Sequence, residues 1–225
     1  SLGETGERID PETGAATRNE SAIAGIATRP LVIGQSGRSR LVAAQPTPFG
    51  LSALGAPLSI DALLPLRDWL GRAEADDLHA AIAREPLGEV SARRLEDALL
   101  ARFTPLPPAV RDRLAAAIAL IEDKRGDVQV TDLLEMLGIG YDRLYRDFRR
   151  HVGIAPKPFI AIVRYQNLVG RLLAEGMGDG LAQLALMQGY YDQAHANRDF
   201  RRFTGVTPTR FRETLNGIAR MMHGL

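Results

Sequence analysis

The sequence predicts a mainly α-helical protein, with an all-helical C-terminal domain that follows a small α+β module. Three observations support this prediction. Apolar residues recur at the three- and four-residue spacing of amphipathic helices from about Ile60 onward. A proline cluster, Pro105, Pro107 and Pro108, interrupts that spacing and indicates a domain boundary. Beyond the cluster, one segment of the sequence occurs twice at a constant interval.

The N-terminal part is the less regular half. Residues 1–20 are rich in glycine and acidic residues and show no apolar period, so we expect a flexible leader. Residues 21–104 are predicted to form the small α+β module, which would serve sensing or oligomerisation. Its stretches Pro30–Ile33 and Arg40–Ala44, separated by glycines, are typical of short strands. Helical spacing then follows at Leu63, Leu66, Trp69, Leu70, Leu78, Ile82, Leu95, Leu99 and Leu100.

We predict a linker at residues 105–109, a helical domain over residues 110–215 and a tail at residues 216–225. The domain should open with an amphipathic helix that ends near Gly126. Its apolar positions are Val110, Leu114, Ile118 and Ile121.

A second, shorter helix is predicted from an N-cap at Thr131 to Leu137, and it should end at Gly138. A third helix begins shortly afterwards, with Gly140 as a weak N-cap. Its predicted apolar stripe is Tyr141, Leu144, Tyr145, Phe148 and Val152, while its other sides carry arginines. A short helix, a glycine turn and a basic helix together indicate a helix-turn-helix.

This unit is duplicated. The segment Arg146–Phe159 recurs 52 residues later as Arg198–Phe211, and eight of the fourteen positions are identical. Chance does not explain this agreement, so we predict two copies of one helix-turn-helix unit. The shared Phe, Gly and Pro residues that follow are assigned to core packing and turns. They are Phe148, Gly153, Pro156, Phe200, Gly205 and Pro208.

In the second copy, Leu181, Leu184 and Ala185 predict a helix that ends at Gly189, and Asp192 is the expected N-cap of the next helix. A connecting helix is expected over Phe159–Glu175. Its residues expected to contact both copies are Ile160, Val163, Leu168, Leu172 and Leu173. Two such units held about one DNA turn apart, roughly 34 Å, would read a longer site than one unit can.

Composition excludes several classes of function. The chain has no cysteine, which excludes a disulfide scaffold, a thiolate metal site and a cysteine nucleophile. The four histidines show no ligand spacing, and nothing in residues 1–105 pairs a nucleophile with a base, so we expect no metal, no cofactor and no enzymatic activity. The longest apolar run, Leu114–Ile121, is too short to cross a bilayer, and no signal peptide is apparent, so we expect a cytoplasmic protein without a membrane partner.

Charge is distributed unevenly. Residues 106–225 carry 17 Arg and Lys against 13 Asp and Glu, whereas residues 1–105 carry 11 against 14. The positive surplus favours a polyanionic partner for the C-terminal half. Solvated helix faces often carry a surplus of four, so charge alone leaves both interpretations open.

Residues 110–213 resemble the DNA-binding region of the AraC family of bacterial transcription regulators. The motifs that carry the resemblance are Gly189–His195, Arg198-Asp199-Phe200 and Gly205–Pro208. The resemblance implies sequence-specific binding to double-stranded DNA, with two recognition helices in successive major-groove segments. Residues 29–70 more weakly resemble an uncharacterised N-terminal domain of some such regulators, in which more strands usually precede this point. An incomplete module is therefore one alternative.

The resemblance also implies which residues contact DNA. The candidates for reading bases are Asp142, Tyr145, Arg146, Gln193, Ala194, Asn197 and Arg198. Arginine can contact guanine O6 and N7, and Asn or Gln can pair with adenine. The candidates for phosphate contact are Arg143, Arg149, Arg150, Lys157, His195, Arg201 and Arg202. The alternatives are an Arg146–Asp142 pair within one helix turn and, for the other arginines, a solvated helix face.

An enzyme and a non-catalytic interaction module are the alternatives to this function. A repair methyltransferase fused to such a domain would need cysteine acceptors, which the chain lacks. A non-catalytic interaction or ligand-binding module with a weakened helix-turn-helix is the main alternative, because the modest charge and Ala196 both favour it. Further partners that we expect are a small-molecule effector on the N-terminal module, a second copy of the chain and RNA polymerase.

Ala196 occupies the position that Leu144 fills in the first copy. Either an empty space remains beneath the second recognition helix or a neighbouring side chain fills it. Three nearby side chains are large enough to do so: Met187, Tyr190 and Tyr191. Ala196→Leu would stabilise the protein in the first case and destabilise it in the second.

Overall fold

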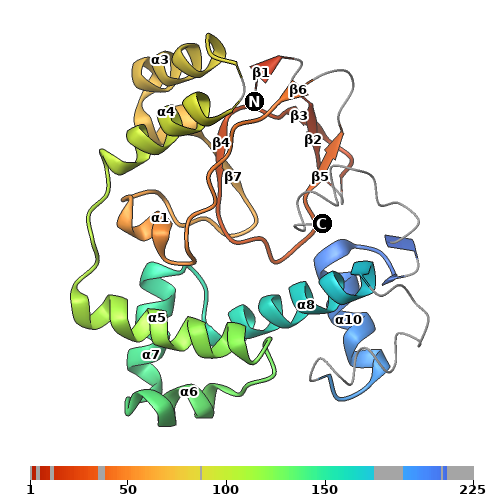
Figure 1. Cartoon of the computed structure of the whole chain (residues 1–225). Helices are drawn as coiled ribbons and strands as arrows, with labels where there is room; N and C mark the ends of the chain where they lie inside the picture. Colours follow the sequence, from red (N-terminus) through yellow and green to blue (C-terminus); the bar gives the residue numbers. More distant parts are fainter. Residues whose placement is uncertain are drawn as a thin grey trace. The chain divides into compact units, whose positions relative to one another are not determined.

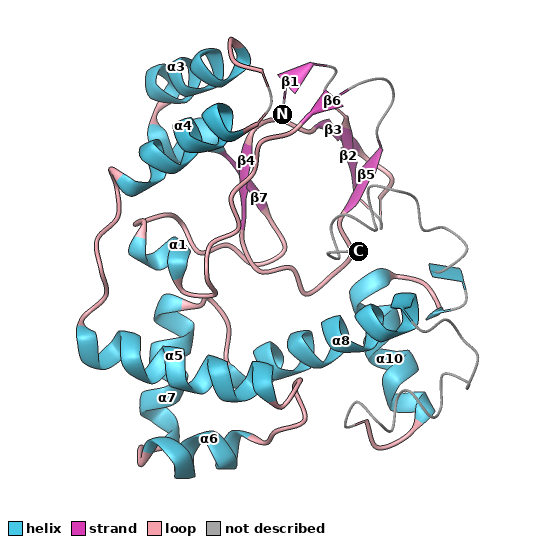
Figure 2. Cartoon of the chain, in the orientation of Figure 1, coloured by secondary structure: helices cyan, strands magenta, loops and turns pink. Residues whose placement is uncertain are grey.

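The computed structural model shows two compact units (Figure 1). The first unit comprises residues 1–27, 31–108 and 150–153, and the second comprises residues 28–30, 109–149 and 154–225. The residues that the structure describes are 2–3, 6–10, 13–34, 39–86, 88–174, 190–208 and 210–211. Among them, helix predominates and the strands all lie at or before Pro65 (Figure 2). The predicted fold class, mainly α with a small α+β module, is confirmed.

Short antiparallel strands build the β part of the first unit. β2 (Glu7–Ile9) lies between β3 (Ala16–Arg18) and β5 (Val32–Gly34). Two further pairs join β4 to β7 and β1 to β6. Their bounds are Ala22–Ala24 and Leu63–Pro65 for the first pair, and Leu2–Gly3 and Ser39–Arg40 for the second.

Residues 1–20 therefore contain strands, although their sequence shows no apolar period. The β3 side chains are exposed, and β2 pairs with β5 more than twenty residues further along the chain. Backbone hydrogen bonds to a distant strand do not require alternating apolar residues, which explains why no apolar pattern predicts these strands. The predicted strands at Pro30–Ile33 and Arg40–Ala44 agree in part, because β5 begins at Val32 and β6 ends at Arg40.

The helix predicted to include Leu63 starts later than the apolar spacing predicts. Leu63–Pro65 is strand β7, in which Leu64 pairs with Ile23, and helix α2 (Leu66–Leu70) follows it. The prediction that Leu63 shares a helical face with Leu66 is wrong, because the pairing with β4 holds residues 63–65 extended. The other helices of this unit are α1 (Gly50–Ala53), α3 (Arg72–Ala83) and α4 (Glu89–Leu100).

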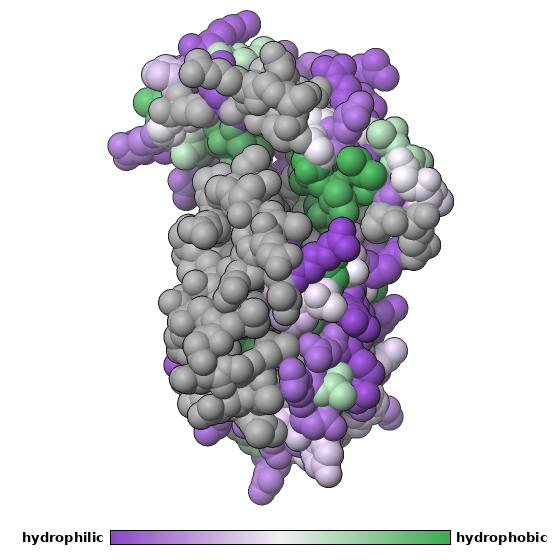
Figure 3. Space-filling model, turned by 90° about the vertical axis from the view of Figure 1, so that its right-hand side faces the viewer, coloured by the Kyte–Doolittle hydropathy of each residue, from purple (hydrophilic) through white to green (hydrophobic). Residues whose placement is uncertain are grey.

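Trp69 on α2 is only half-buried. The guanidinium carbon of Arg102 lies 5.6 Å from the centre of its ring. Arg102 also pairs with Glu74 of α3, and the hydrogen bond from Arg102 lowers the pKa of Glu74. Elsewhere in the first unit, Leu31, Val32 and Ile33 form an exposed apolar stretch at strand β5. On the face drawn in Figure 3, most of the coloured residues are hydrophilic, and a smaller group of hydrophobic residues lies among them.

The second unit begins with α5 (Pro108–Asp123), α6 (Val130–Leu137) and α7 (Tyr141–His151). The left-handed residue Gly138, with φ +62°, ends α6 as predicted. The N-cap of α6 is Gln129 and not Thr131, because the backbone N–H of Gln129 donates to the Asp132 carboxylate at 2.8 Å.

Helix α8 (Pro156–Ala174) connects the two copies, and α10 (Gln193–Thr204) carries the second recognition segment. Near the start of α8, the Phe159 ring packs edge-on against Phe148 of α7, with centroids 5.7 Å apart. Further along, Tyr165 packs against Phe200 of α10 at 5.6 Å. The connecting helix therefore contacts both copies, as predicted. The helix predicted to end at Gly189 and the side chains of Leu172 and Leu173 lie outside the described residues.

Candidate nucleic-acid interface

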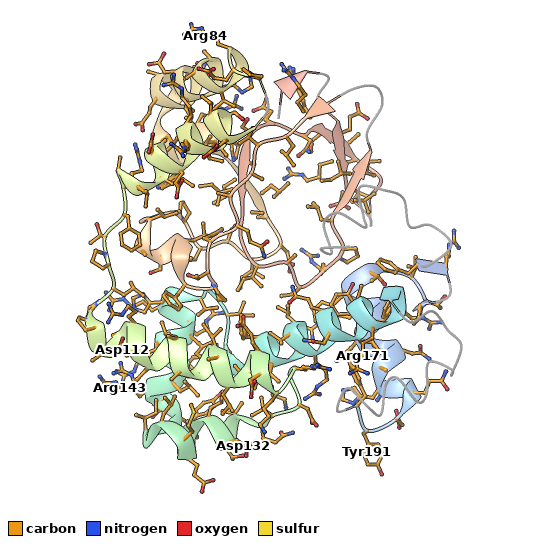
Figure 4. All side chains as sticks on the ribbon, in the orientation of Figure 1. Arg84, Asp112, Asp132, Arg143, Arg171 and Tyr191 are labelled. Carbon is orange, nitrogen blue, oxygen red and sulfur yellow. The ribbon has the colours of Figure 1, made fainter. Side chains whose placement is uncertain are left out.

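Helix α7 separates buried and exposed residues on opposite faces. Leu144 and Phe148 are 1% and 0% exposed and pack into the core. One outer face carries residues spaced at i, i+1, i+4, i+5 and i+8, which share a side of a helix. They are Tyr141, Asp142, Tyr145, Arg146 and Arg149, and all five are exposed. Arg143 points outward from the same helix (Figure 4).

Tyr141 and Tyr145 stack on each other at this face. Their ring centroids are 5.8 Å apart, and the residues are 50% and 38% exposed. The predicted apolar stripe is therefore wrong at these two positions, because the core side of α7 is set by Leu144, Phe148 and the following Val152. Tyr141 was not among the predicted DNA contacts. The 52-residue offset onto Gln193, which was among them, is the signal that could have identified it.

The Arg146 side chain is restrained by its own helix. Its Nε donates to the backbone oxygen of Asp142 at 3.2 Å. Among the described side chains, the Asp142 carboxylate makes no ion pair with Arg146, so the expected alternative of a pair within one helix turn is not observed. The guanidinium group is thus held on the outer face of α7.

An ion pair that the sequence analysis did not predict anchors α7. Arg113 of α5 donates to one carboxylate oxygen of Asp147 from Nε at 3.0 Å and from Nη2 at 2.8 Å. The two side chains are 16% and 15% exposed, so solvent screens the pair less than a surface pair. This pair fixes the side of α7 that faces α5 and leaves the opposite side outward.

Helix α10 presents the matching face in the second copy. Asp192 caps it as predicted, accepting a hydrogen bond from the His195 backbone N–H at 2.6 Å. Ala196, Phe200 and Phe203 are buried. The outer residues Gln193, Ala194, Arg198 and Arg201 are exposed, and Asn197 is partly exposed.

The phosphate-contact candidates differ in their surroundings. The side chains of Arg143, Arg149, Arg150, Lys157, Arg201 and Arg202 are exposed. His195 is partly buried, with its ring edge-on to Tyr190 at 5.2 Å and its Nε2 3.8 Å from a carboxylate oxygen of Asp199. These contacts hold His195 close to the core of the second copy. A phosphate contact by His195 is therefore less favoured than one by the arginines.

Comparison with known families agrees with this geometry. The helix-turn-helix domain family HTH_18 matches residues 133–214, a range that begins within α6 and includes α7, α8 and α10. Residues 133–214 form an AraC-type helix-turn-helix domain. The resemblance in the sequence motifs is thereby confirmed.

Two curated relatives are similar to part of the chain. An uncharacterized HTH-type transcriptional regulator of Haemophilus influenzae is 28% identical over 101 residues, which cover 45% of this chain and 33% of the relative. The HTH-type transcriptional regulator MtrA of Neisseria gonorrhoeae is 28% identical over 102 residues, with the same coverage. The chain thus spans about a third of the length of these relatives. No solved structure matches the chain.

The described residues contain neither a membrane-spanning helix nor a cluster of metal ligands. No helix within the described ranges is long and apolar enough to span a membrane. In the same ranges, no three His, Asp or Glu residues are grouped as the ligands of a metal ion would be.

The core of the second copy in the AraC-type domain shows which side chains surround Ala196. Ala196 is 0% exposed and shares a buried cluster with Tyr165, Tyr190 and Phe200. Tyr190 is 3% exposed, whereas Tyr191 is 87% exposed and points outward (Figure 4). Tyr190 therefore contributes its ring to the space next to Ala196. Met187 lies outside the described residues.

Because Tyr190 shares this space, we expect Ala196→Leu to lower the free energy of unfolding by about 1–3 kcal/mol through overpacking. Denaturant melts of the variant and the parent measure the difference. Ala194→Leu, two residues earlier on the exposed face of α10, is the matched control and should be nearly neutral. A gain of stability for Ala196→Leu would show that the space is empty.

Burial also sets the ionisation of the two core tyrosines. Desolvation raises the pKa of Tyr165 and of Tyr190, and the nearby Asp199 carboxylate raises the pKa of Tyr190 further. Both phenols are therefore neutral at physiological pH. The core of the second copy is uncharged at these two tyrosines, and the arginines of α10 are exposed.

Proposed function

We propose that this chain acts as a sequence-specific DNA-binding transcription regulator, with α7 and α10 as its recognition helices. One observation carries the proposal: two duplicated helices present the same five positions outward. At 52-residue spacing, Tyr141 corresponds to Gln193, Asp142 to Ala194, Tyr145 to Asn197, Arg146 to Arg198 and Arg149 to Arg201. The names of both curated relatives support the same function.

Each outer face combines two kinds of contact. Arg146 and Arg198 can donate two hydrogen bonds to a guanine edge, and Asn197 and Gln193 can pair with adenine. The stacked tyrosines of α7 offer apolar surface to a thymine methyl group. Exposed arginines at the ends of these faces, such as Arg149 and Arg201, would bind phosphates and set the register on the duplex.

The same proposal assigns no catalysis to the chain, because binding and positioning on DNA account for the exposed residues of α7 and α10. The remaining partners need separate experiments. Sedimentation would test for a second copy of the chain, and binding to purified RNA polymerase would test that contact.

Selection of bound sites from a random duplex pool tests the function directly. We expect the selected sequences to contain two short conserved segments separated by about one helical turn, roughly 10 base pairs. Recovery of unselected sequence, with no enrichment over many rounds, would contradict the proposal and favour the alternative of an interaction module.

Two arginine variants then test which residues read bases. Arg146→Ala and Arg198→Ala should each weaken binding to the selected site by about 1–3 kcal/mol and relax the preference in different half-sites. Arg111→Ala, which removes an exposed arginine paired with Asp112 on α5, is the matched control and should leave specificity unchanged. An equal loss of affinity on all sequences would show that both arginines contact phosphates and not bases.

A further inference from the structure

The loop between α5 and α6 is pressed against the connecting helix α8 at one point. Gly126 in this loop is buried and has φ +77°. A Cβ atom at this position would lie 2.5 Å from the backbone nitrogen of Arg164 and 2.8 Å from its Cα. Real Cβ atoms do not approach a helix backbone so closely, and a side chain also disfavours this φ. Glycine is therefore required here, and the first copy is seated on α8 beside Arg164.

The side chain of Arg164 continues this contact. Its Nε and Nη2 donate to the carbonyl oxygen of Gly126 at 3.0 and 2.7 Å. Both hydrogen bonds are charge-assisted, and the side chain is partly buried, so solvent competes weakly for them. Gly126 belongs to the first copy, because it follows α5 and precedes α6.

The same guanidinium group also contacts the second copy. Its central carbon lies 5.5 Å from the ring centre of Tyr190, within the range of a cation–π interaction. Tyr190 is 3% exposed and belongs to the buried cluster of Ala196 and Phe200 beneath α10. Its hydroxyl has no hydrogen-bond partner among the described residues. Packing and the contact with Arg164 therefore hold the ring, and no hydrogen bond of its hydroxyl is seen to do so.

We propose that Arg164 is a positioning residue that fixes the two copies relative to each other, and so sets the half-site spacing that the domain accepts. The consequence for DNA rests on the proposed function. One planar group joins a backbone oxygen of the first copy to an aromatic ring of the second, midway along the helix that connects them. A lysine at this position has a single ammonium group, so it cannot donate from two nitrogens while lying flat over a ring.

The absence of cysteine in the chain permits a test that does not depend on DNA. Glu135→Cys on α6 and Tyr191→Cys before α10 place one thiol at an exposed position of each copy. Pulsed electron paramagnetic resonance of spin labels on these thiols measures the distance between the copies. We expect one narrow distance distribution in the labelled parent and a distribution at least twice as broad with Arg164→Ala.

Two further variants keep the test decisive. Arg164→Lys retains the charge and helix propensity, so it should stay folded by circular dichroism and still broaden the distribution. Gln166→Ala, an exposed change on the same helix, is the matched control and should leave the distribution unchanged. A distribution as narrow in folded Arg164→Lys and Arg164→Ala as in the parent would overturn the proposal.

The consequence for DNA is measured on the selected site. We expect the parent to lose at least tenfold in affinity when the spacing between half-sites changes by one or two base pairs. Arg164→Lys should flatten this dependence while leaving the affinity for a duplex with a single half-site unchanged. A steep, unchanged dependence would contradict the assignment of spacing to Arg164. If the parent binds no duplex selectively, the proposed function fails, and the distance measurement still decides the role of Arg164.

Discussion

Phe200→Ala is expected to lower the free energy of unfolding of the second unit by about 3–5 kcal/mol, and Phe148→Ala should do the same. Both rings are 0% exposed. Phe200 packs edge-on against Tyr165 and Phe211, and Phe148 packs against Phe159. Removing either ring leaves a cavity between α8 and a recognition helix. Since a domain is typically stable by about 5–15 kcal/mol, the loss would remove much of its stability.

Denaturant unfolding followed by circular dichroism measures this loss. Tyr191→Ala also removes an aromatic ring next to α10, but Tyr191 is 87% exposed, so this control should change stability by less than about 0.5 kcal/mol. The affinity of Phe200→Ala for the selected DNA should fall because its recognition helix loses its support. Unfolding of Phe200→Ala at the parent's denaturant concentration would show that α10 is not held by this core.

Affinity for DNA is expected to fall about 10³-fold between 50 and 200 mM salt. Six exposed cationic side chains are assigned to phosphates, and each contact releases condensed counterions when it forms. They are Arg143, Arg149, Arg150, Lys157, Arg201 and Arg202. Six contacts give a slope of roughly −5 in a plot of log affinity against log salt concentration.

Fluorescence anisotropy of a labelled duplex over a salt series measures this slope. Arg143→Ala should make it shallower by about one unit and weaken binding similarly on all sequences, as expected for a phosphate contact. Arg111→Ala, at the exposed ion pair with Asp112, should leave the slope unchanged. An affinity that does not vary with salt would contradict DNA binding through these residues.

Local signals in the sequence account for much of the helical domain. Gly138 ends α6 and Asp192 caps α10, because each acts through its own backbone or its nearest neighbours. The duplicated segment identifies Phe148 and Phe200 as core residues, since two copies of one unit need the same internal packing. These features depend on contacts within a few residues or on repetition, and both can be read from the chain itself.

The sequence signals were wrong at one helix end and on one helix face. The N-cap of α6 is Gln129 and not Thr131, because the Asp132 carboxylate accepts the hydrogen bond from the backbone of Gln129. The apolar spacing of α7 included Tyr141 and Tyr145, which are hydrophobic enough to suit either side of the helix. The Arg113–Asp147 ion pair helps to orient α7 with both rings outward, and residues 34 positions apart form that pair.

The sequence alone determined the fold class, the duplication and the core positions Phe148 and Phe200, because helical periodicity and repetition are properties of the chain. Only the tertiary structure decided the strands of residues 2–65, the burial of Tyr190 in one cluster with Ala196, and the contact of Arg164 with Gly126 and Tyr190. Each of these joins residues distant in sequence. Their partners are chosen by packing and hydrogen bonding in the folded chain, and no local pattern of residue types records that choice.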